Sequence, residues 1–269
     1  MAQGLSQLAA RLAAGGSVCA EEEAELLLAE AQSPQQLEHM VAVRLLGQPL
    51  EYVLGRAWLA GVRVAVESGV FVPRVRTELL VREAVARVPP HRAIIVDMCC
   101  GSGAVGAADP GPPAGGPPGR AAFRRQRSSG GALRAPQPSH FPRTPPAAWA
   151  TCMRRCRPAW LAGCTLSSPT APHVPSRAVA HLPREAHLYE APAALDGGAD
   201  GLDVLWRVAA GAPARLAAGG HVLVEASPPQ APAVFESHGF SAEVILDSDR
   251  EAASVVGTLR LRVSAAAAG

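Results

Sequence analysis

A short apolar run that passes directly into a glycine pair constrains the fold of this chain more than any other stretch. Residues 94 to 96 are β-branched, as in a strand that is covered on both faces, and Asp97 follows at the strand's carboxyl end. Gly101 and Gly103 allow the backbone to turn sharply, and residues 104 to 108 can begin a helix behind them. Ligands of open α/β sheets bind at this end of a strand. The stretch therefore favours an α/β domain with a ligand-binding loop, with a purely structural turn as the alternative.

The composition is that of a soluble globular protein. The chain has 269 residues and a net charge of +2, and no apolar run approaches the roughly 18 residues of a membrane helix. Residues 1 to 7 lack the pattern of a signal peptide, so we expect a cytoplasmic protein without membrane contact. Cys152, Cys156 and Cys164 form no Cys-x-x-Cys pair, and we expect no metal site. The chain contains neither Lys nor Asn, which indicates a GC-rich gene.

The first part of the sequence is predicted to be helical. Leucines recur at helical spacing within residues 5 to 12, and residues 21 to 31 are rich in helix formers. Residues 33 to 36, Ser-Pro-Gln-Gln, form a capping box with proline at the first helical position. We therefore predict a small helical domain over residues 1 to 46.

A segment of loose alternation links this domain to the next. Valines alternate with other residues between positions 62 and 72, so residues 47 to 76 are predicted to form a linker that contains a β-hairpin. Residues 77 to 88 return to a helical pattern. The apolar face of this helix is expected to consist of Val81, Ala84, Val85 and Val88.

Regular patterns resume near residue 175. A polar turn at residues 196 to 202 leads into a helix. The apolar face of that helix is expected to carry Leu202, Leu205, Trp206 and Ala209. Residues 221 to 225 are predicted to be a strand, and we interpret Glu225 as its exposed end. The remaining predicted elements are a helix over residues 229–237 and strands over 242–246 and 254–263.

The middle of the chain conflicts with its surroundings. From residue 110 to residue 184 there is no Asp or Glu, while Arg, Pro, Gly and Ser abound and no hydrophobic period can be followed. Such a segment buries too little apolar surface to offset the entropy lost on ordering. We therefore predict that residues 110 to 170 are disordered or out of frame, although a doubly wound domain would carry strands and helices there.

Four spaced motifs resemble those of one family, and they occur in the same order. They are residues 47–55 (Gly-Gln-Pro-Leu-Glu-Tyr-Val-Leu-Gly), 69–74 (Gly-Val-Phe-Val-Pro-Arg) with Thr77 and Glu78, 97–103, and 194–202. With these motifs the sequence resembles the HemK/PrmC-type S-adenosylmethionine-dependent methyltransferases, which methylate the glutamine side-chain amide of translation release factors. The resemblance implies an α/β architecture with a small N-terminal helical domain, a β-hairpin linker and a class I, Rossmann-like domain over residues 77 to 269. That domain has seven strands in the family, and here its central strands and helices are expected to be degraded or disordered.

The resemblance also implies roles for particular residues. Binding of the cofactor S-adenosylmethionine falls to the loop residues Asp97, Cys99, Cys100, Gly101, Ser102 and Gly103. Cys99 stands where many members carry glycine, which requires that its φ is not positive. Binding of the substrate, a peptide chain release factor, falls to Thr170, Ala171, Pro172 and His173. No residue is assigned a catalytic role, and Arg74 and Glu78 are interpreted either as a buried ion pair or as substrate contacts.

Two departures from the family pattern bear on activity. In such enzymes an acid at the end of the second strand holds the ribose, and the nearest acid here, Asp109, follows Gly103 too closely for an intervening helix and strand. The Asn of the substrate motif is replaced by Thr170. One hypothesis explains both departures: part of residues 109 to 170 derives from the wrong reading frame or from unspliced sequence. The chain would then methylate its substrate slowly or not at all.

Two other functions remain open from the sequence alone. One is a catalytically inactive family member that still binds the release factor. The other is RNA binding by the arginines within residues 120 to 134 and 154 to 157, since disordered Arg-rich segments can fold on RNA. Sparse aromatic residues and a nearly neutral chain argue against nucleic acid as a partner.

Overall fold

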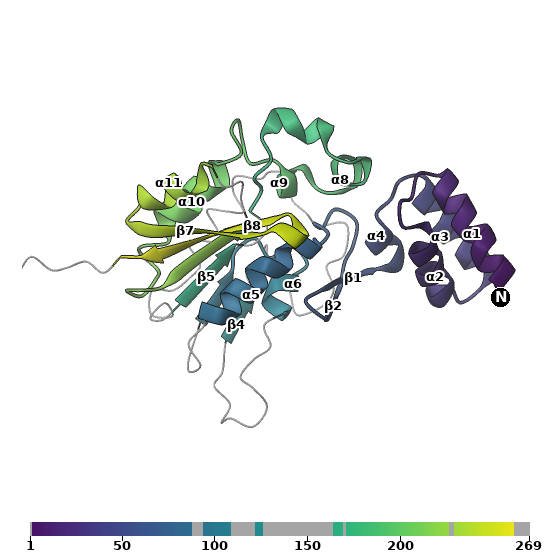
Figure 1. Cartoon of the computed structure of the whole chain (residues 1–269), viewed down its shortest axis with the longest axis horizontal. Coiled ribbons are helices and arrows are strands. Elements are labelled where there is room, and N and C mark those ends of the chain that lie inside the picture. The colour runs from purple at the N-terminus through teal and green to yellow at the C-terminus, as the bar shows by residue number, and fades with distance from the viewer. Residues whose placement is uncertain are drawn as a thin grey trace, which may run out of the picture.

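The computed structural model describes residues 2–87, 94–108, 122–125, 164–168, 171–225 and 229–260. A helical body that holds the N-terminus lies beside a larger α/β body (Figure 1). The helices of the N-terminal body are α1 Ala2–Ala14, α2 Ala20–Glu30, α3 Pro34–Leu45 and α4 Leu50–Leu54.

The helical body has its own core and a capped third helix. Leu12 and Leu27 are fully buried in it, and α4 packs on the same cluster, so this body extends beyond the predicted boundary at residue 46. The predicted capping box is confirmed, because the Ser33 hydroxyl accepts the Gln36 amide at 3.1 Å. The Gln36 side chain accepts the amide of Gln32 at 2.8 Å, one residue before the cap.

The linker contains the predicted hairpin. Its strands are β1 Arg56–Leu59 and β2 Val62–Ala65, which pair antiparallel. Ala60 and Gly61 form the turn with φ values of 47° and 76°, as a tight two-residue hairpin turn requires. The residues before β1 form helix α4 rather than strand, since the alternation of apolar residues begins only in the hairpin itself.

The predicted helix after the linker is confirmed, but its buried face is rotated from the one expected. A 3-10 turn, η1 Val75–Thr77, leads into α5 Glu78–Arg87. The buried residues of α5 are Leu79, Leu80, Val81 and Ala84. Val85 is 37% exposed, and Val88 lies outside the described residues. Leu80 instead faces the core with Leu223 and Val256, so α5 presents the neighbouring stripe to the sheet.

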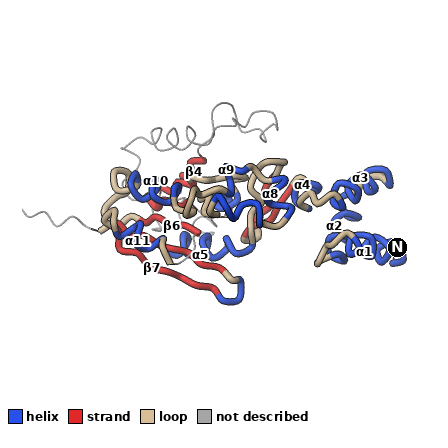
Figure 2. The backbone as a smooth tube through the Cα atoms, turned by 90° about the horizontal axis from the view of Figure 1, so that it is seen from above, coloured by secondary structure: helices blue, strands red, loops and turns tan. Residues whose placement is uncertain are grey.

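Strands form the centre of the α/β body, between helices (Figure 2). Within the described residues they make a six-stranded sheet in the order β4-β3-β5-β6-β8-β7. Its strands are β3 Ile94–Asp97, β4 Ala122–Arg125, β5 Cys164–Ser168, β6 His221–Glu225, β7 Phe240–Asp247 and β8 Ala252–Leu259. The first four strands in this order pair parallel, and β8 runs antiparallel to both β6 and β7. The predicted α/β, Rossmann-like class is confirmed.

The segment expected to lack packing contributes two of these strands. Both β4 and β5 fall within residues 110 to 170, and both pair with β3, so that Ile94 lies opposite Ala122 on one side and Cys164 on the other. Pairing through the backbone needs no hydrophobic period, which is why the sequence pattern did not indicate these strands. The rest of residues 110 to 170 lies outside the described residues.

Helices cover both faces of the sheet, and β6 shows how. Val222 and Val224 face a core that includes α10 and α11, while Leu223 faces α5, α6 and the hairpin. The helical elements not yet named are α6 Ala104–Ala107, η3 Ser176–His181, α8 Arg184–Tyr189, α9 Pro192–Leu195, α10 Asp203–Gly211, α11 Ala231–Glu236 and η4 Ser248–Arg250. In the part of the chain that the structure describes, no helix has the length and apolarity to cross a bilayer.

The face of α10 differs from the one expected. Val204, Leu205, Val208 and Ala209 are buried, whereas Trp206 is 43% exposed and lies edge-on to His238. The four aliphatic side chains pack in the core against β6, whereas the indole of Trp206 lies at the border of the core. The expectation for Trp206 was therefore wrong.

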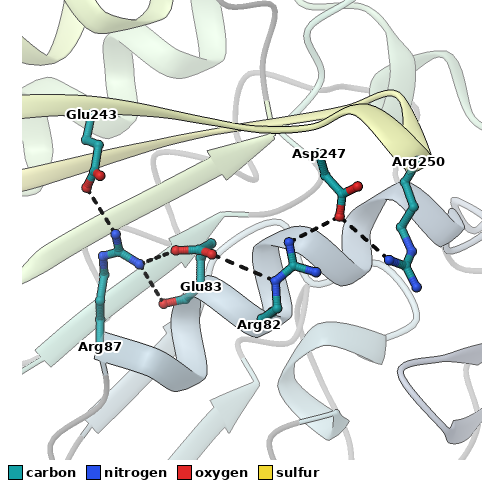
Figure 3. A network of polar contacts seen from close by, with 6 residues as sticks. All are labelled: Arg82, Glu83, Arg87, Glu243, Asp247 and Arg250. Carbon is teal, nitrogen blue, oxygen red and sulfur yellow. Dashed lines mark hydrogen bonds and ion pairs between the residues drawn. The ribbon is translucent and has the colours of Figure 1, made fainter.

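Ion pairs hold α5 against the hairpin of β7 and β8 (Figure 3). Arg82 contacts Asp247 at 3.1 Å and Arg250 contacts the same carboxylate at 3.6 Å, while Arg87 contacts Glu243 at 3.1 Å. The hydrogen bond from Arg82 holds the pKa of Asp247 below its ordinary value. The pairs of Arg82 and Arg87 thus join α5 to β7 at the edge of the sheet, while the pair of Arg250 and Asp247 lies within the hairpin itself.

Candidate active site

The carboxyl ends of three neighbouring parallel strands bring the candidate residues to one edge of the sheet. The loop 97–103 follows β3, residues 171–173 follow shortly after β5, and Glu225 ends β6. The chain passes from β3 to β4 on one side and later returns to β5 on the other side of β3. The end of β3 is thus a topological switch point, where ligands of doubly wound sheets bind.

The loop after β3 has the conformation that its glycines permit. Gly101 and Gly103 have φ values of 47° and 75°. Cys99 has a negative φ, because only Ala60 and Glu251 among the described non-glycine residues have a positive one, so the requirement on Cys99 is confirmed. Asp97 is 2% exposed, and its Oδ2 accepts the amide of Gly106 in α6 at 3.3 Å.

The loop packs against the linker. A Cβ on Gly101 would lie 3.9 Å from the Cys99 carbonyl oxygen and from Cβ of Phe71, which is ordinary van der Waals contact. Asp109, the nearest acid for the ribose, lies outside the described residues.

The segment after β5 is held by the loop 194–202 through close backbone contacts. The amide of Val174 donates to the Leu195 carbonyl at 3.1 Å, and the amide of Gly197 donates to the Val174 carbonyl at 2.9 Å. A Cβ on Gly201 would lie 2.3 Å from the His173 carbonyl oxygen. These glycines are therefore needed for close approach of two backbones. Thr170, the first residue of the expected substrate motif, lies outside the described residues.

The ring of His173 is turned back onto its own segment. Its Nδ1 lies 3.0 Å from the carbonyl oxygen of Ala171, and Ala171 itself is 4% exposed. The imidazole therefore has a fixed orientation at the end of β5. His173 also lines two cavities at this edge of the sheet.

Glu225 is not the exposed strand end that the sequence suggested. It is 7% exposed. Its Oε2 accepts a hydrogen bond from the hydroxyl of Thr77 at 2.8 Å, and its Oε1 accepts one from Nε of Arg76. The interpretation was wrong because η1, far away in the sequence, covers the end of β6. Arg76 is a partner that the sequence analysis missed, and only its position beside the linker motif could have drawn attention to it.

Arg74 and Glu78 do not pair with each other. Arg74 donates to Glu190, which is 3% exposed, and its guanidinium lies 5.1 Å from the centre of the Phe71 ring. Glu78 accepts the amide of Ala60 and pairs with an arginine of η4. Burial raises the pKa of the Glu190 carboxyl, and the charge of Arg74 opposes that rise. The buried ion pair therefore exists, but with a partner that sequence spacing did not indicate.

Two cavities meet at this edge of the sheet. The first has a volume of about 260 Å³ and lies between the linker, residues 171–174 and the helices α8 and α9. The second has a volume of about 350 Å³ and lies beside α10. The residues that line both are Ala171, His173 and Glu225. Phe71, Arg74 and Arg76 line only the first cavity. Within the described ranges no cluster of His, Cys, Asp or Glu could hold a metal ion.

The fold and the loop at its switch point define a Rossmann-like domain of the methyltransferase class. No protein-family model matches the chain. A release factor glutamine methyltransferase of Geobacter sulfurreducens is 31% identical over 219 residues, which span 75% of this chain and 69% of that protein. The chain belongs to the release factor glutamine methyltransferase family.

Two further matches agree in name with this one. The release factor glutamine methyltransferase of Mycolicibacterium smegmatis is 38% identical over 112 residues, which span 36% of this chain and 40% of that relative. Less than half of the mycobacterial relative is therefore matched. A solved structure, the release factor-specific protein-(glutamine-N5) methyltransferase of Alicyclobacillus acidocaldarius, overlaps 71% of this chain and 95% of its own, with a TM-score of 0.39 and 21% identity.

Proposed function

We propose that this chain transfers a methyl group from S-adenosylmethionine to the side-chain amide of a glutamine in a translation release factor. One observation carries the proposal: the glycine loop, the segment 171–173 and Glu225 lie at the carboxyl ends of three adjacent parallel strands. A cofactor and a substrate side chain bound there would meet at the residues shared by the two cavities. Such a substrate places the protein in the cytoplasm.

The loop residues would hold the cofactor through backbone and carboxylate contacts. Asp97 is buried at the end of β3, and the loop residues from Cys99 to Gly103 follow it beside Phe71, outside the lining of the two cavities. When bound, S-adenosylmethionine supplies a methyl group on a positively charged sulfur. If no acid reaches the ribose, one charged hydrogen-bond set of about 1.5–3 kcal/mol is missing, which weakens binding about tenfold or more.

The substrate residues have to orient an amide nitrogen whose lone pair is delocalised. The N–CH₃ bond forms as the S–CH₃ bond breaks, and the methylated amide releases one proton to solvent. Acceptors that grip the amide N–H groups aim the nitrogen at the methyl carbon. Ala171 and Glu225 line both cavities and Pro172 lines the second, and their carbonyl or carboxylate oxygens would serve as such acceptors.

Thr170 is expected to slow the reaction. A hydroxyl accepts one hydrogen bond but cannot grip the glutamine amide as the planar side chain of Asn can. Losing one such oriented contact costs on the order of a hundred- to a thousandfold in rate. The chain is therefore proposed to be an impaired enzyme.

The test is transfer of labelled methyl from S-adenosylmethionine to a purified release factor. We expect slow transfer by this chain, faster transfer by Thr170→Asn, and none to a release factor whose acceptor glutamine is replaced by Glu. Thr170→Ser is the matched control and should leave the rate unchanged. Equal rates for this chain and Thr170→Asn would mean that the substrate segment is placed wrongly.

A second candidate function follows from the same two departures at Asp109 and Thr170. It is a catalytically inactive family member that binds the release factor, or RNA, without turnover. Calorimetry separates the two candidates: no heat with S-adenosylmethionine, together with saturable binding of the release factor, would favour the inactive one. A steep salt dependence of RNA binding that requires residues 110 to 160 would identify RNA as the partner.

A further inference from the structure

The N-terminal helical body is joined to the α/β body by one buried arginine. Arg44, at the end of α3, binds both carboxylate oxygens of Glu23 in α2, at 2.8 and 2.7 Å. Its NH1 donates to Glu185 in α8 at 2.6 Å and to the Gln48 carbonyl at 3.1 Å. The Arg44 side chain is 11% exposed, and its hydrogen bond to the Glu23 carboxylate raises the pKa of Arg44. The guanidinium of Arg44, which contacts α8, is therefore always charged, and Glu23 of the N-terminal body holds it in position.

Two other contacts join the same helix to the N-terminal body. The hydroxyl of Tyr189, the last residue of α8, donates to the carbonyl of Leu46 at 3.0 Å. The Arg184 side chain lies beside Gly47, 3.5 Å from the place that a Cβ on Gly47 would take. Contacts therefore run from the first residue of α8 to its last, and Figure 1 shows α8 on the side of the α/β body that faces the N-terminal helices.

The amino end of α8 and the two residues before it form a wall of the first cavity. Leu182, Pro183, Glu185 and Ala186 line that cavity together with Phe71 and Arg74 of the linker. Immediately after α8, Glu190 forms the buried pair with Arg74. Helix α8 is thus attached to the N-terminal body along its length and to the linker through the residue that follows it.

The helix depends on these attachments for its position. It has six residues, only Ala186 is buried, and its first turn has no side-chain cap. A helix this short is not stable by itself in water. Without the contacts to the N-terminal body, the amino end of α8 could move away from Phe71.

We propose that Glu185 is a positioning residue, through which Arg44 and the N-terminal body set the width of the cavity that takes the substrate glutamine segment. This inference rests on the proposed function. The N-terminal body then contributes to substrate binding without lining the cavity itself. Glu185 is 41% exposed, so its pair with Arg44 is modest alone, and Tyr189 has to be changed with it.

The experiment compares the full-length chain with Glu185→Gln, Tyr189→Phe and the double variant. We expect the double variant to raise the KM for the release factor and for a short glutamine peptide about tenfold, with kcat and the Kd for S-adenosylmethionine unchanged. Glu38→Gln is the matched control, because it removes the pair of Arg11 and Glu38 on the outer surface of the same helical body. It should change none of these values.

A second measurement does not depend on turnover. Amide hydrogen exchange of residues 184 to 189 should accelerate in the double variant, while that of residues 221 to 225 stays the same. Unchanged exchange in α8, or an unchanged KM with a lowered Tm, would overturn the inference. If the chain transfers no methyl group to any release factor, the proposed function fails, and the exchange of α8 then decides this inference by itself.

Discussion

The hydroxyl of Thr77 donates to Oε2 of Glu225 at 2.8 Å, across 148 residues of sequence. Thr77 is 1% exposed and Glu225 is 7% exposed, so the bond lies inside the protein. It joins η1 to the end of β6, and Arg76, the last residue of the linker, donates to the same carboxylate, which belongs to a residue that lines both cavities. The linker is therefore part of the candidate site rather than a tether between two bodies.

Replacing Thr77 with Val should destabilise the fold by about 1–3 kcal/mol, because a buried carboxylate loses a hydrogen bond while the shape is kept. Urea unfolding monitored by circular dichroism measures this difference. Thr77→Ser keeps the hydroxyl and should cost much less. Equal losses for Val and Ser would show that packing of the methyl group, not the bond to Glu225, matters.

Gly101→Ala should weaken binding of S-adenosylmethionine. At a φ of 47° the strain of a non-glycine residue is about 1–2 kcal/mol, which the loop can relieve by leaving its conformation. Gly61→Ala is the control, since Gly61 has a φ of 76° with nothing near its Cβ and lies in the hairpin turn. Calorimetry should find weaker binding for the first variant only. Similar affinities for both variants would place the cofactor elsewhere.

Gly201→Ala should destabilise the chain more than Gly219→Ala. Both glycines have positive φ, but a Cβ at residue 201 would lie 2.3 Å from the His173 carbonyl, whereas nothing lies within 4 Å at residue 219. We expect an additional loss of about 1–3 kcal/mol for the first variant, as in overpacked sites. Paired thermal unfolding curves measure it, and equal shifts in Tm would contradict the close approach of the two loops.

Stability should fall as the pH drops from about 7 to about 5, in part because of His221. Burial, and then the charge of Arg87, lower the pKa of His221 in the folded protein. The unfolded chain then binds a proton more readily, so this contribution is complete above the ordinary pKa of about 6.5 and is lost as the pH falls toward the lowered value. His221→Gln should give a flatter profile of urea midpoints against pH. An identical slope would exclude His221 as the source.

Local features of the sequence predicted local structure well. The glycine loop, the capping box and the hairpin turn each depend on residues close together in the chain, and each has the predicted conformation. The buried faces of α5 and α10 differ from the predicted ones, because Val85 and Trp206 are apolar but lie at the margin of the core. An apolar period indicates a stripe, but packing against the sheet decides which residues at its margin are buried.

Long-range pairs could not be predicted. Arg74 donates to Glu190 across 116 residues and Arg76 to Glu225 across 149, and no spacing rule connects such positions. The same holds for β4 and β5, which pair through the backbone in a segment without a hydrophobic pattern. The loop 97–103 and the segment 171–173 were predicted as sites because of motifs, and their roles stay predictions.

The order of strands in the sheet has a consequence for the way the chain folds. β6, β7 and β8 pair within one continuous stretch, whereas Ile94 of β3 meets Cys164 only after a long loop has closed. Because loop closure has to precede such distant pairing, we expect the carboxyl-terminal unit to form early and the middle of the sheet late. Pulsed hydrogen exchange during refolding should protect Val222 before Ile94. During synthesis, β3 and the glycine loop that follows it would therefore lack the neighbouring strand β5 until most of the protein had left the ribosome.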